Sequence, residues 1–480
     1  MLLFIPKNFS IRNSLKLTIP KLPLNDLLLL LPNNVLFVFT VPLAMNSTLK
    51  NQSEILAKLG IKKLNPMQEE ALQVISEQSE VVLLSPTGTG KTLAFLLPII
   101  STLDTELDEV QALIVVPSRE LAIQIETVVR SMGSGFKVNA VYGGRSSYKD
   151  RTEIEHRPAI LVGTPGRVLD HLKNEQFTTQ HLTTLVLDEF DKSLEIGFEE
   201  EMKALIALLP KVKQRILTSA TQGLAIPAFV RLRNPAEINY LHEGLTQLVL
   251  KTIEYTPGKK DDALIETLKH QGNNQGIIFC NFKESIQQVI DLLLKNRLKY
   301  GVFHGGLEQI DRERALIKFR NGTSQFLLAT DLAARGIDIP EIRFIIHYEL
   351  PKKKDEFTHR NGRTARMKKD GVAFLLKSEK ENLPDFIKDA PVVQLKSGKP
   401  EPRVSWKTLH ISGGRKDKIS KGDIAGFFLK QGKLDNDLLG LIEIKQDCAY
   451  VAVVESEVNK LIKVLDSTRL KTKKVRVTTV

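Results

Sequence analysis

Residues 85–92, with the sequence SPTGTGKT, have the residue types and the spacing of a loop that binds nucleotide phosphates. Gly88 and Gly90 carry no side chain, so the backbone N–H groups around them can approach phosphate oxygens closely. The Lys91 ammonium can reach the β- and γ-phosphates, and the Thr92 hydroxyl is suited to hold Mg²⁺. This octet therefore predicts a nucleotide site that uses a magnesium ion.

The flanks of the octet support that prediction. Residues 80–85, EVVLLS, are typical of a buried parallel strand, and residues 92–100, TLAFLLPII, are typical of a helix. A strand, a loop and a helix in this order form the structural context that a phosphate loop requires.

Two carboxylates follow another apolar run further along the chain. Residues 185–187 are typical of a strand buried on both faces, and DEFD comes directly after them at 188–191. Asp188 can orient Mg²⁺ and its water ligands, and Glu189 can polarise a water for attack on the γ-phosphate. An acidic turn that caps the next helix is the alternative interpretation, but the upstream phosphate loop favours catalysis.

A basic segment, HRNGRTAR at 359–366, lies too far downstream to belong to the same small domain. Its guanidinium groups, on Arg360, Arg363 and Arg366, have the chemistry of arginine fingers, which stabilise the charge that develops during phosphoryl transfer. A solvated basic face is the simpler alternative. Arg363 and Arg366 are three residues apart and would share one side of a helix.

Composition indicates a globular protein with an anionic partner. The 480 residues are 42% hydrophobic and 26% charged, and they carry a formal net charge of +12. A length of this kind corresponds to two to four domains, and the positive charge favours nucleic acid as the partner. The two cysteines, Cys280 and Cys448, give no disulfide framework and no metal spacing, which is typical of a reducing cytoplasm.

The first 44 residues differ from the rest of the chain. They are apolar and basic, but prolines and asparagines such as Pro32 and Asn33 interrupt every apolar run. No run approaches the ~20 residues that span a bilayer, so no membrane association is expected. A transit peptide is one interpretation. The simpler one is that translation starts at Met45 and that residues 1–44 are a non-native or disordered extension.

The rest of the chain alternates apolar runs with helix-like stretches, which predicts an α/β fold built on parallel sheets. The runs of the first half lie at 81–84, 112–116, 159–163, 184–188 and 215–219, and those of the second at 276–280, 300–304, 326–330, 342–348 and 371–376. We expect a first lobe at 45–240, a second at 245–390, a linker at 391–404 and a small α+β domain at 405–480.

These motifs resemble, in order and spacing, the DEAD-box family of ATP-dependent RNA helicases over about residues 50–380. Further segments carry the resemblance: PSRELA (117–122), GG (143–144), TPGR (164–167), SAT (219–221), HGG (304–306), QIDR (309–312) and ATDLAARGID (329–338). The resemblance implies two RecA-like lobes that bind ATP, Mg²⁺ and RNA together.

It also implies a role for individual residues. ATP would be bound by Gln68, Ser85, Pro86, Thr87, Gly88, Thr89, Gly90, Lys91, Thr92 and Asp338, and Mg²⁺ by Thr92 and Asp188, largely through water. Catalysis would use Glu189, Asp188, Lys91, Arg363 and Arg366. Coupling between nucleotide and RNA would use Asp191, Ser219, Thr221, His359 and Arg360. RNA phosphates would be held by Arg119, Gly144, Thr164 and Arg167 of lobe one and by Gln309, Arg312 and Thr330 of lobe two.

The sequence departs from the family pattern at several positions. Phe190 replaces the usual alanine of the acidic motif, so the packing behind the carboxylates must differ. Ser118 replaces a common threonine, and Asn361 replaces a common apolar residue. Asn51 stands where an aromatic residue often stacks on adenine, which would weaken the affinity for ATP.

Residues 405–480 are similar to the RNA-recognition-motif tail of DbpA-type bacterial helicases. They contain 15 Lys and Arg against 9 Asp and Glu, half of the net charge of the whole chain. In this resemblance His410 and Tyr450 are ring-bearing positions of the RNA-binding strands, and Cys448 replaces a second aromatic residue. A basic domain without a ligand is the alternative.

The combined interpretation is a monomeric, cytoplasmic, RNA-stimulated ATPase that separates short RNA duplexes. The resemblance of the tail implies structured ribosomal RNA as the partner and ribosome assembly as the process. An ATP-gated RNA clamp that remodels RNA–protein complexes is the alternative. A DNA-translocating helicase fits the nucleotide motifs but neither the tail nor residues 59–68, LGIKKLNPMQ, which resemble the family's adenine-reading segment with Gln68 at the base edge.

Overall fold

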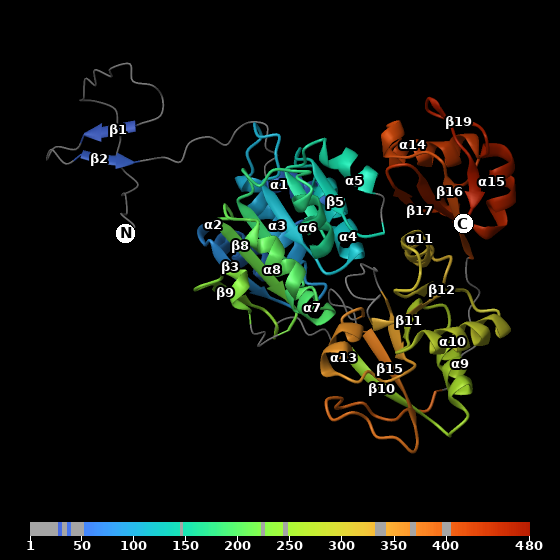
Figure 1. Ribbon diagram of the computed structural model, residues 1–480. Coiled ribbons are helices and arrows are strands. Elements are labelled where there is room, and N and C mark those ends of the chain that lie inside the picture. Colours follow the sequence, from blue (N-terminus) through green and yellow to red (C-terminus); the bar gives the residue numbers. More distant parts are fainter. Residues whose placement is uncertain are drawn as a thin grey trace, which may run out of the picture. The chain divides into compact units, whose positions relative to one another are not determined.

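The computed structural model describes residues 27–30, 36–39, 52–144, 147–221, 226–242, 248–331, 342–364, 371–395 and 405–480 (Figure 1). The chain divides into two compact units, Met1–Leu49 and Lys50–Val480. In the first unit, β1 (Leu27–Leu30) and β2 (Leu36–Phe39) pair antiparallel. The remainder of the predicted extension, 1–44, lies outside the described residues, as do 396–404 of the predicted linker.

Lobe one is a seven-stranded parallel sheet in the order β5-β6-β4-β7-β8-β3-β9. Its strands are β3 (Glu80–Leu84), β4 (Ala112–Val115), β5 (Val138–Val141), β6 (Ile160–Gly163), β7 (Thr184–Leu187), β8 (Gln214–Ser219) and β9 (Ala236–Asn239). Its helices are α1 (Gln52–Leu59), α2 (Pro66–Glu77), α3 (Lys91–Thr102), α4 (Arg119–Met132), α5 (Ser147–Ile154), α6 (Pro165–Lys173), α7 (Phe190–Ile196) and α8 (Glu199–Ala207).

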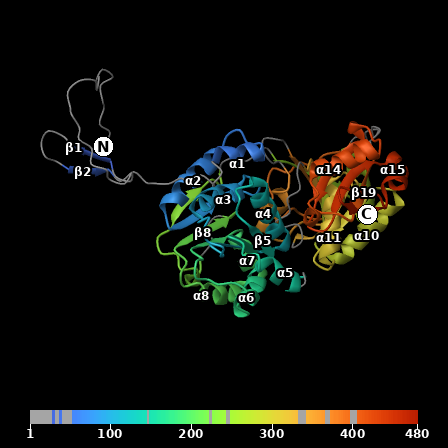
Figure 2. The ribbon, with the colours of Figure 1, turned by 90° about the horizontal axis from the view of Figure 1, so that it is seen from above.

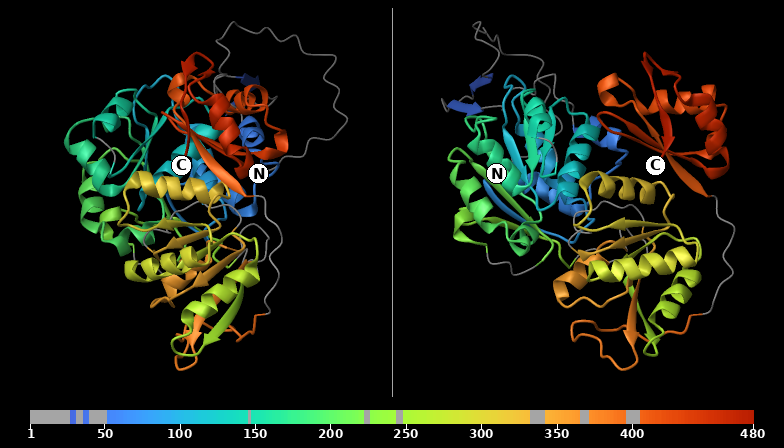
Figure 3. Two further views of the ribbon diagram at one scale, coloured as in Figure 1. Left: turned by 90° about the vertical axis from the view of Figure 1, so that its right-hand side faces the viewer. Right: turned by 45° about the vertical axis from the view of Figure 1, so that its right-hand side comes forward.

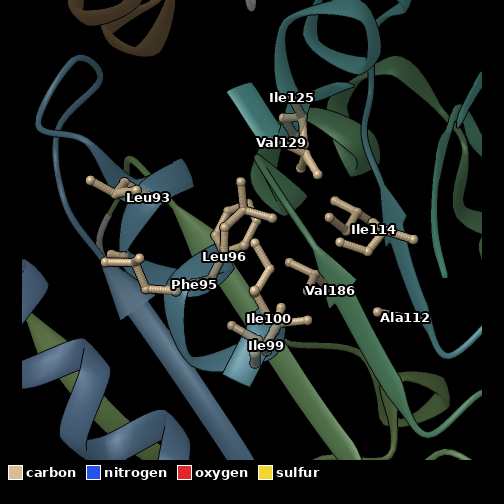
Figure 4. Close-up of a cluster of buried hydrophobic side chains, with 14 of the residues drawn as sticks. Leu93, Phe95, Leu96, Ile99, Ile100, Ala112, Ile114, Ile125, Val129 and Val186 are labelled. Carbon is tan, nitrogen blue, oxygen red and sulfur yellow. The ribbon is translucent and has the colours of Figure 1, made fainter. Parts of the chain in front are cut away.

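Alternating strand residues of lobe one enter two separate cores. Val81 and Leu83 of β3 belong to the core beneath α1 to α4, whereas Val82 and Leu84 belong to the core with α6 to α8. Figure 2 shows these two groups of helices on opposite sides of the sheet. The first core includes residues of α3, α4, β4 and β7 (Figure 4). Because both faces are buried, the strands consist of continuous apolar runs. Helix α3, whose N-terminus follows the phosphate loop, packs into the first core along its length.

Lobe two is a six-stranded parallel sheet in the order β10-β15-β14-β11-β13-β12. The strands are β10 (Leu248–Tyr255), β11 (Gly276–Phe279), β12 (Tyr300–Phe303), β13 (Phe326–Ala329), β14 (Phe344–His347) and β15 (Gly371–Ser378). The helices are α9 (Lys260–Gln271), α10 (Lys283–Lys295), α11 (Gln309–Arg320) and α13 (Lys354–Asn361). One face packs against α9 and α10, and the other packs against α11.

The C-terminal domain has an antiparallel sheet in the order β17-β18-β16-β21. Its elements are β16 (Trp406–Ile411), α14 (Lys421–Gly426), β17 (Leu439–Ile444), β18 (Ala449–Val454), α15 (Val458–Leu465), β21 (Val477–Thr479) and the short pair β19 (Arg469–Leu470) and β20 (Lys473–Lys474). Its helices gather on one side of the sheet (Figure 3), where they enclose a single apolar core.

The predicted fold class, two parallel-sheet lobes followed by a small α+β domain, is confirmed. Three strands of the two lobes were not predicted, β5, β9 and β10, and neither were the short pairs β1–β2 and β19–β20. Strands β5 and β9 are short and contain polar residues such as Asn139 and Glu237, and β10 ends in TIEY, which lacks a continuous apolar run. None of the helices in the described part of the chain has the length and hydropathy to cross a membrane.

Candidate nucleotide and RNA site

The phosphate loop joins β3 to the N-terminus of α3. Gly88 has φ +86° and Gly90 has φ +91°, a conformation that side chains rarely adopt. A Cβ atom on Gly90 would also lie 2.4 Å from the Gln68 amide nitrogen. The glycines therefore let the loop turn tightly and expose the first N–H groups of α3, where the helix dipole favours an anion.

Gln68, the predicted adenine-reading residue, is fixed at the start of α2. Its backbone N–H donates to the Asn65 side chain (2.9 Å), and its Oε1 accepts from the Asn65 backbone N–H (3.1 Å), which forms a capping box. Both side chains also reach the loop: Asn65 Nδ2 donates to the Thr89 carbonyl (2.9 Å) and Gln68 Nε2 to the Gly90 carbonyl (3.3 Å). The helix cap thus holds the phosphate loop in position.

Lys91 and the loop hydroxyls lie inside the same turn. The Lys91 ammonium donates to the carbonyls of Ser85 and Pro86 (2.9 Å to the latter), and the hydroxyls of Ser85 and Thr89 are 2.7 Å apart. Burial lowers the pKa of Lys91, and the carboxylates of Asp188 and Glu189 oppose that shift. Thr92 follows Lys91 in the first turn of α3.

The predicted catalytic carboxylates, Asp188 and Glu189, directly follow β7, at the same edge of the sheet as the phosphate loop. Asp188 accepts a hydrogen bond from the Thr218 hydroxyl, and the Glu189 backbone N–H donates to Thr218 Oγ1 (3.1 Å). Burial raises the pKa of both Asp188 and Glu189, and Lys91 opposes the shift in each. Glu189 has φ +47°, a strained backbone conformation typical of functional positions.

A chain of hydrogen bonds links three predicted coupling residues, Asp191, Thr221 and Ser219, to the phosphate loop. The Thr221 hydroxyl donates to Asp191 Oδ2 (3.0 Å), and the Thr221 backbone N–H donates to Ser219 Oγ (3.0 Å). The Ser85 backbone N–H in turn donates to the Ser219 carbonyl (3.1 Å). The arrangement can transmit a displacement at the phosphate loop to β8.

Lobe two contributes positive charge to the same site. The Thr87 hydroxyl donates to the Gly362 carbonyl (3.2 Å), which brings the end of α13 against the phosphate loop. Arg363, the next residue, is buried and acts electrostatically on both Glu189 and Lys91. The charges of the predicted finger Arg363 and of the predicted catalytic residue Glu189 therefore interact.

Arg360, one of the predicted coupling residues, is held by hydrogen bonds within lobe two. Its guanidinium, only 1% exposed, pairs with both oxygens of Asp331 (2.6 and 2.5 Å) and donates to Asn281 Oδ1 (2.6 Å) and to the Glu349 carbonyl (2.8 Å). These bonds lie within lobe two, so Arg360 holds α13 in position. Asp331, Asn281 and Glu349 were not identified from the sequence: Asp331 lies within the motif at 329–338, which does not reveal its partner, and Asn281 and Glu349 lie in segments without a motif.

Asn361 completes this network. Its Oδ1 lies 3.1 Å from His347 Nε2, and Arg360 Nη1 lies 3.4 Å from His347 Nδ1, so the ring donates to Asn361 and accepts from Arg360. Burial, followed by the Arg360 charge, lowers the pKa of His347 to about 3. The unusual residue Asn361 thus supplies the hydrogen bond that a neutral buried histidine requires. His359, a predicted coupling residue on the same helix, is buried.

The predicted RNA contacts of the two lobes meet through Glu120. Arg312 Nη1 lies 3.3 Å from Glu120 Oε1, and Gln309 Nε2 donates to the same oxygen (3.3 Å). Arg119 lies over Gly144, where an added Cβ would be 2.5 Å from a guanidinium nitrogen. Burial lowers the pKa of Arg119, and the nearby charge of Arg312 adds to the shift. Glu120 was not predicted, and it neutralises part of this basic cluster.

The other predicted RNA-binding residues have separate surroundings. Thr164 caps α6, and Arg167 pairs with Asp150 (2.8 Å) and Asp170 (3.2 Å). Thr330 follows β13. His410 and Tyr450 lie on neighbouring strands of the C-terminal sheet, remote from the phosphate loop in sequence. Asp338 and Arg366 lie outside the described residues.

Comparisons with known proteins cover most of the chain. Residues 65–226 match the DEAD/DEAH box helicase family, residues 259–368 the helicase conserved C-terminal domain, and residues 408–479 the DbpA RNA binding domain. The chain is 32% identical to ATP-dependent RNA helicase DbpA of Bacillus subtilis (87% of this chain, 95% of the relative) and 33% identical to that of Escherichia coli (88% and 95%).

Solved structures are similar over the two lobes. Saccharomyces cerevisiae Dbp5 bound to RNA and ADP BeF3 is 28% identical with a TM-score of 0.61, over 68% of this chain and 88% of that one. The helicase Mss116 bound to ssRNA and UDP-BeF is 28% identical with a TM-score of 0.60, over 69% and 74%. The two parallel-sheet lobes of this chain therefore have the same fold as the lobes of these structures.

We expect Phe190→Ala, which restores the residue usual in the family, to destabilise lobe one. Phe190 is fully buried in the core beneath α7 and α8, and its truncation would leave a cavity that costs about 3–5 kcal/mol. Chemical denaturation of the variant measures the loss. Tyr148→Ala removes an aromatic ring that is 72% exposed and is the control; equal stabilities of the two variants would contradict the packing argument.

The neutral state of His347 predicts a pH dependence of stability. Its folded pKa is about 3, below the unfolded value of about 6.5, so the unfolded chain binds the proton first and stability falls as pH drops from 6.5 towards 3. Between pH 6.5 and 5 the loss should be about 2 kcal/mol. Hydrogen exchange of the β14 amides should show this loss in the wild type and a smaller one in His347→Gln. His156→Gln, an exposed histidine of lobe one, should behave as the wild type does.

Proposed function

Because the chain belongs to the DEAD-box family of ATP-dependent RNA helicases, we propose that it separates short RNA duplexes locally and acts on structured ribosomal RNA. The main support for the proposal is that both lobes contribute to one site. Thr87 of lobe one donates a hydrogen bond to Gly362 of lobe two, and Arg363 of lobe two acts electrostatically on Lys91 and Glu189 of lobe one. A site completed by both lobes makes ATP turnover depend on their approach.

ATP would be bound by the phosphate loop and the Gln68 amide, and Mg²⁺ by the Thr92 hydroxyl and by Asp188, largely through water. The donor set fits this ion, since Mg²⁺ prefers oxygen ligands, retains several waters and is usually held together with substrate phosphates. No cluster of three or more His, Cys, Asp or Glu suited to a metal occurs among the described residues, so the phosphates would complete the coordination.

In this mechanism Glu189 orients the attacking water and accepts its proton, and its raised pKa makes it a stronger base. Lys91 and Arg363 stabilise the charge on the transferring phosphoryl group. Arg360 holds α13 so that Arg363 reaches the site. Arg366 and Asp338, as the finger and ribose contacts implied by the family, belong to the same proposal.

Closure on RNA would couple this chemistry to strand separation. Arg119, Gly144, Thr164 and Arg167 of lobe one and Gln309, Arg312 and Thr330 of lobe two would hold one strand by its phosphates. Opening about six base pairs costs roughly 8 kcal/mol if RNA stacking is comparable to that of DNA, at about 1.4 kcal/mol per step. Micromolar binding supplies about as much, so one cycle opens a short duplex.

Two observations support a structured RNA target. Residues 408–479 match the DbpA RNA binding domain, and residues 405–480 carry a net charge of +6. Ribosomal RNA and ribosome assembly are the proposal that follows from this likeness. We propose that the protein acts as a monomer in the cytoplasm, where the free thiols of Cys280 and Cys448 would stay reduced.

The catalytic assignment predicts that Glu189→Gln binds ATP and RNA but loses hydrolysis, because the amide cannot take a proton from water. RNA should dissociate more slowly from the variant, since the closed state is not reset. Phosphate release and RNA dissociation, measured on the full chain, test both statements. Glu199→Gln removes an equal charge from an exposed position on α8 and should hydrolyse ATP normally. Normal hydrolysis by Glu189→Gln would refute the assignment.

The assignment of the substrate predicts different results with different nucleic acids. The protein should displace strands from short RNA duplexes with ATP, should fail on DNA duplexes, and should hydrolyse ATP faster with large-subunit ribosomal RNA than with an unrelated structured RNA of equal length. Deletion of residues 405–480 should abolish that preference. ATP-dependent RNA retention without strand displacement would instead favour the clamp, and identical ranking of RNAs by both proteins would exclude the tail as selector.

A further inference from the structure

Thr218 is a polar residue at a fully buried position of β8. The strand alternates its side chains between the two cores of lobe one: Ile216 lies in the core beneath α1 to α4, and Leu217 lies in the core with α6 to α8. Thr218 therefore lies on the same face of the sheet as Ile216. A buried hydroxyl costs free energy unless it is hydrogen-bonded, so the partners of this hydroxyl indicate what the position is used for.

The partners of the Thr218 hydroxyl are the two residues that follow β7. The hydroxyl donates to Asp188 Oδ1 and accepts from the Glu189 backbone N–H (3.1 Å). The same N–H also donates to Asp188 Oδ1 (3.1 Å), so the three groups form a closed ring of hydrogen bonds. A single hydroxyl thus uses both its donor and an acceptor position on the predicted catalytic pair.

This ring of hydrogen bonds fixes the carboxylate of Asp188. Two donors, the Thr218 hydroxyl and the Glu189 N–H, converge on Oδ1. Because the two oxygens of a carboxylate lie in one plane with its carbon, holding Oδ1 from two directions also fixes the direction of Oδ2. Hydrogen bonds that orient a metal ligand in this way are worth about 10- to 100-fold in metal affinity or activity.

The same ring supports the backbone at Glu189. Its φ of +47° is a conformation that non-glycine residues rarely adopt and that persists only where the surroundings stabilise it. The hydrogen bond from the Glu189 N–H to Thr218 Oγ1 is such a stabilising contact. The direction in which the Glu189 side chain leaves the main chain therefore depends on Thr218.

Thr218 also adjoins the predicted coupling residues. In the next position, the Ser219 carbonyl accepts from the Ser85 N–H of the phosphate loop (3.1 Å), and the Thr221 hydroxyl donates to Asp191 Oδ2 in α7 (3.0 Å). The end of β8 is thus bonded to the phosphate loop, to the carboxylates after β7 and to α7. A displacement of this strand end would be felt by all three.

We propose that Thr218 is a positioning residue for ATP hydrolysis, whose hydroxyl orients Asp188 towards Mg²⁺ and Glu189 towards the attacking water and joins both to the coupling segment at 219–221. The proposal rests on the proposed function in that Asp188 and Glu189 have those roles. It adds a residue that acts through its two partners rather than on the substrate. The motifs did not identify Thr218, because it precedes the SAT segment at 219–221.

The first test is the Mg²⁺ requirement of nucleotide binding, measured on the full chain without RNA by titrating Mg²⁺ in the presence of a fluorescent ATP analogue. Thr218→Val keeps the branched shape of the side chain and removes the hydroxyl. The half-saturating Mg²⁺ concentration should rise by about 10- to 100-fold, whereas the affinity for the analogue in excess EDTA should stay at the wild-type value. Thr218→Ser keeps the hydroxyl and should have the wild-type Mg²⁺ requirement.

The second test is ATP hydrolysis at saturating RNA and Mg²⁺, with kcat calculated from the concentration of nucleotide-binding sites so that unfolded protein does not contribute. Thr218→Val should lower kcat by about 10- to 100-fold and leave the KM for ATP unchanged, as expected of a group that acts on the transition state. Thr218→Ser should retain most of the wild-type kcat.

Thr252→Val is the matched control. Thr252 is also a fully buried threonine on a strand, and its hydroxyl donates to the Ala390 carbonyl within lobe two (2.8 Å). This variant should lose stability in chemical denaturation, as Thr218→Val does, and keep the wild-type Mg²⁺ requirement and kcat. Thr218→Ala removes the hydroxyl without adding an atom to the core; it should reproduce the Mg²⁺ shift and replaces Thr218→Val if that variant does not fold.

A wild-type Mg²⁺ requirement in the folded Thr218→Val or Thr218→Ala protein would overturn the proposal, as would an equal shift in Thr218→Ser or in Thr252→Val. Glu189→Gln, measured in parallel, separates this proposal from the proposed function. Loss of hydrolysis in Glu189→Gln together with wild-type behaviour of the Thr218 variants refutes the role of Thr218 alone, whereas normal hydrolysis in Glu189→Gln refutes the catalytic assignment on which both depend.

Discussion

The burial of charge at one edge of the first sheet is the constraint on which the structure depends. Lys91, Asp188 and Asp191 are each less than a tenth exposed, and burial moves the pKa of Lys91 down and that of Asp188 up. Charges in such surroundings cost free energy unless opposite charges and hydrogen bonds compensate. The phosphate loop, β7 and β8 provide that compensation only if their ends are held in register, which the two apolar cores of lobe one ensure.

Lobe two likewise buries a cation, Arg360, and compensates its charge with hydrogen-bond partners of its own. Arg360 uses its guanidinium on Asp331, Asn281 and the Glu349 carbonyl, so the end of α13 is rigid. In the proposed mechanism this rigidity matters because Arg363 follows Arg360 by three residues and acts electrostatically on Glu189 in the other lobe. A positioned arginine pays its ordering entropy during folding rather than at each turnover, which is the physical basis of preorganised catalysis.

The sequence was sufficient to predict what depends on local pattern. The octet at 85–92, the carboxylates after an apolar strand and the alternation of runs each follow from short-range chemistry, and most of both sheets was predicted from them. It was insufficient where the partner is distant. The strand β10 contains polar and half-exposed residues and is defined by pairing with β15, more than a hundred residues later. The ion pairs of Arg167 with Asp150 and of Arg360 with Asp331 could not be predicted either. A basic motif does not reveal which carboxylate neutralises it.

The C-terminal domain illustrates the same limit in a way that changes its interpretation. Considered alone, a ring-bearing sheet with Cys448 in place of an aromatic residue indicates weakened base stacking. In the folded chain, Glu443 is the cross-strand neighbour of Tyr450, which in turn neighbours His410. Glu443 accepts two hydrogen bonds from Arg320 of lobe two. A carboxylate repels RNA phosphates on an open sheet, but here it is neutralised by lobe two. The presence of a carboxylate on this face is therefore explained by its contact with lobe two, where Arg320 pairs with Glu443.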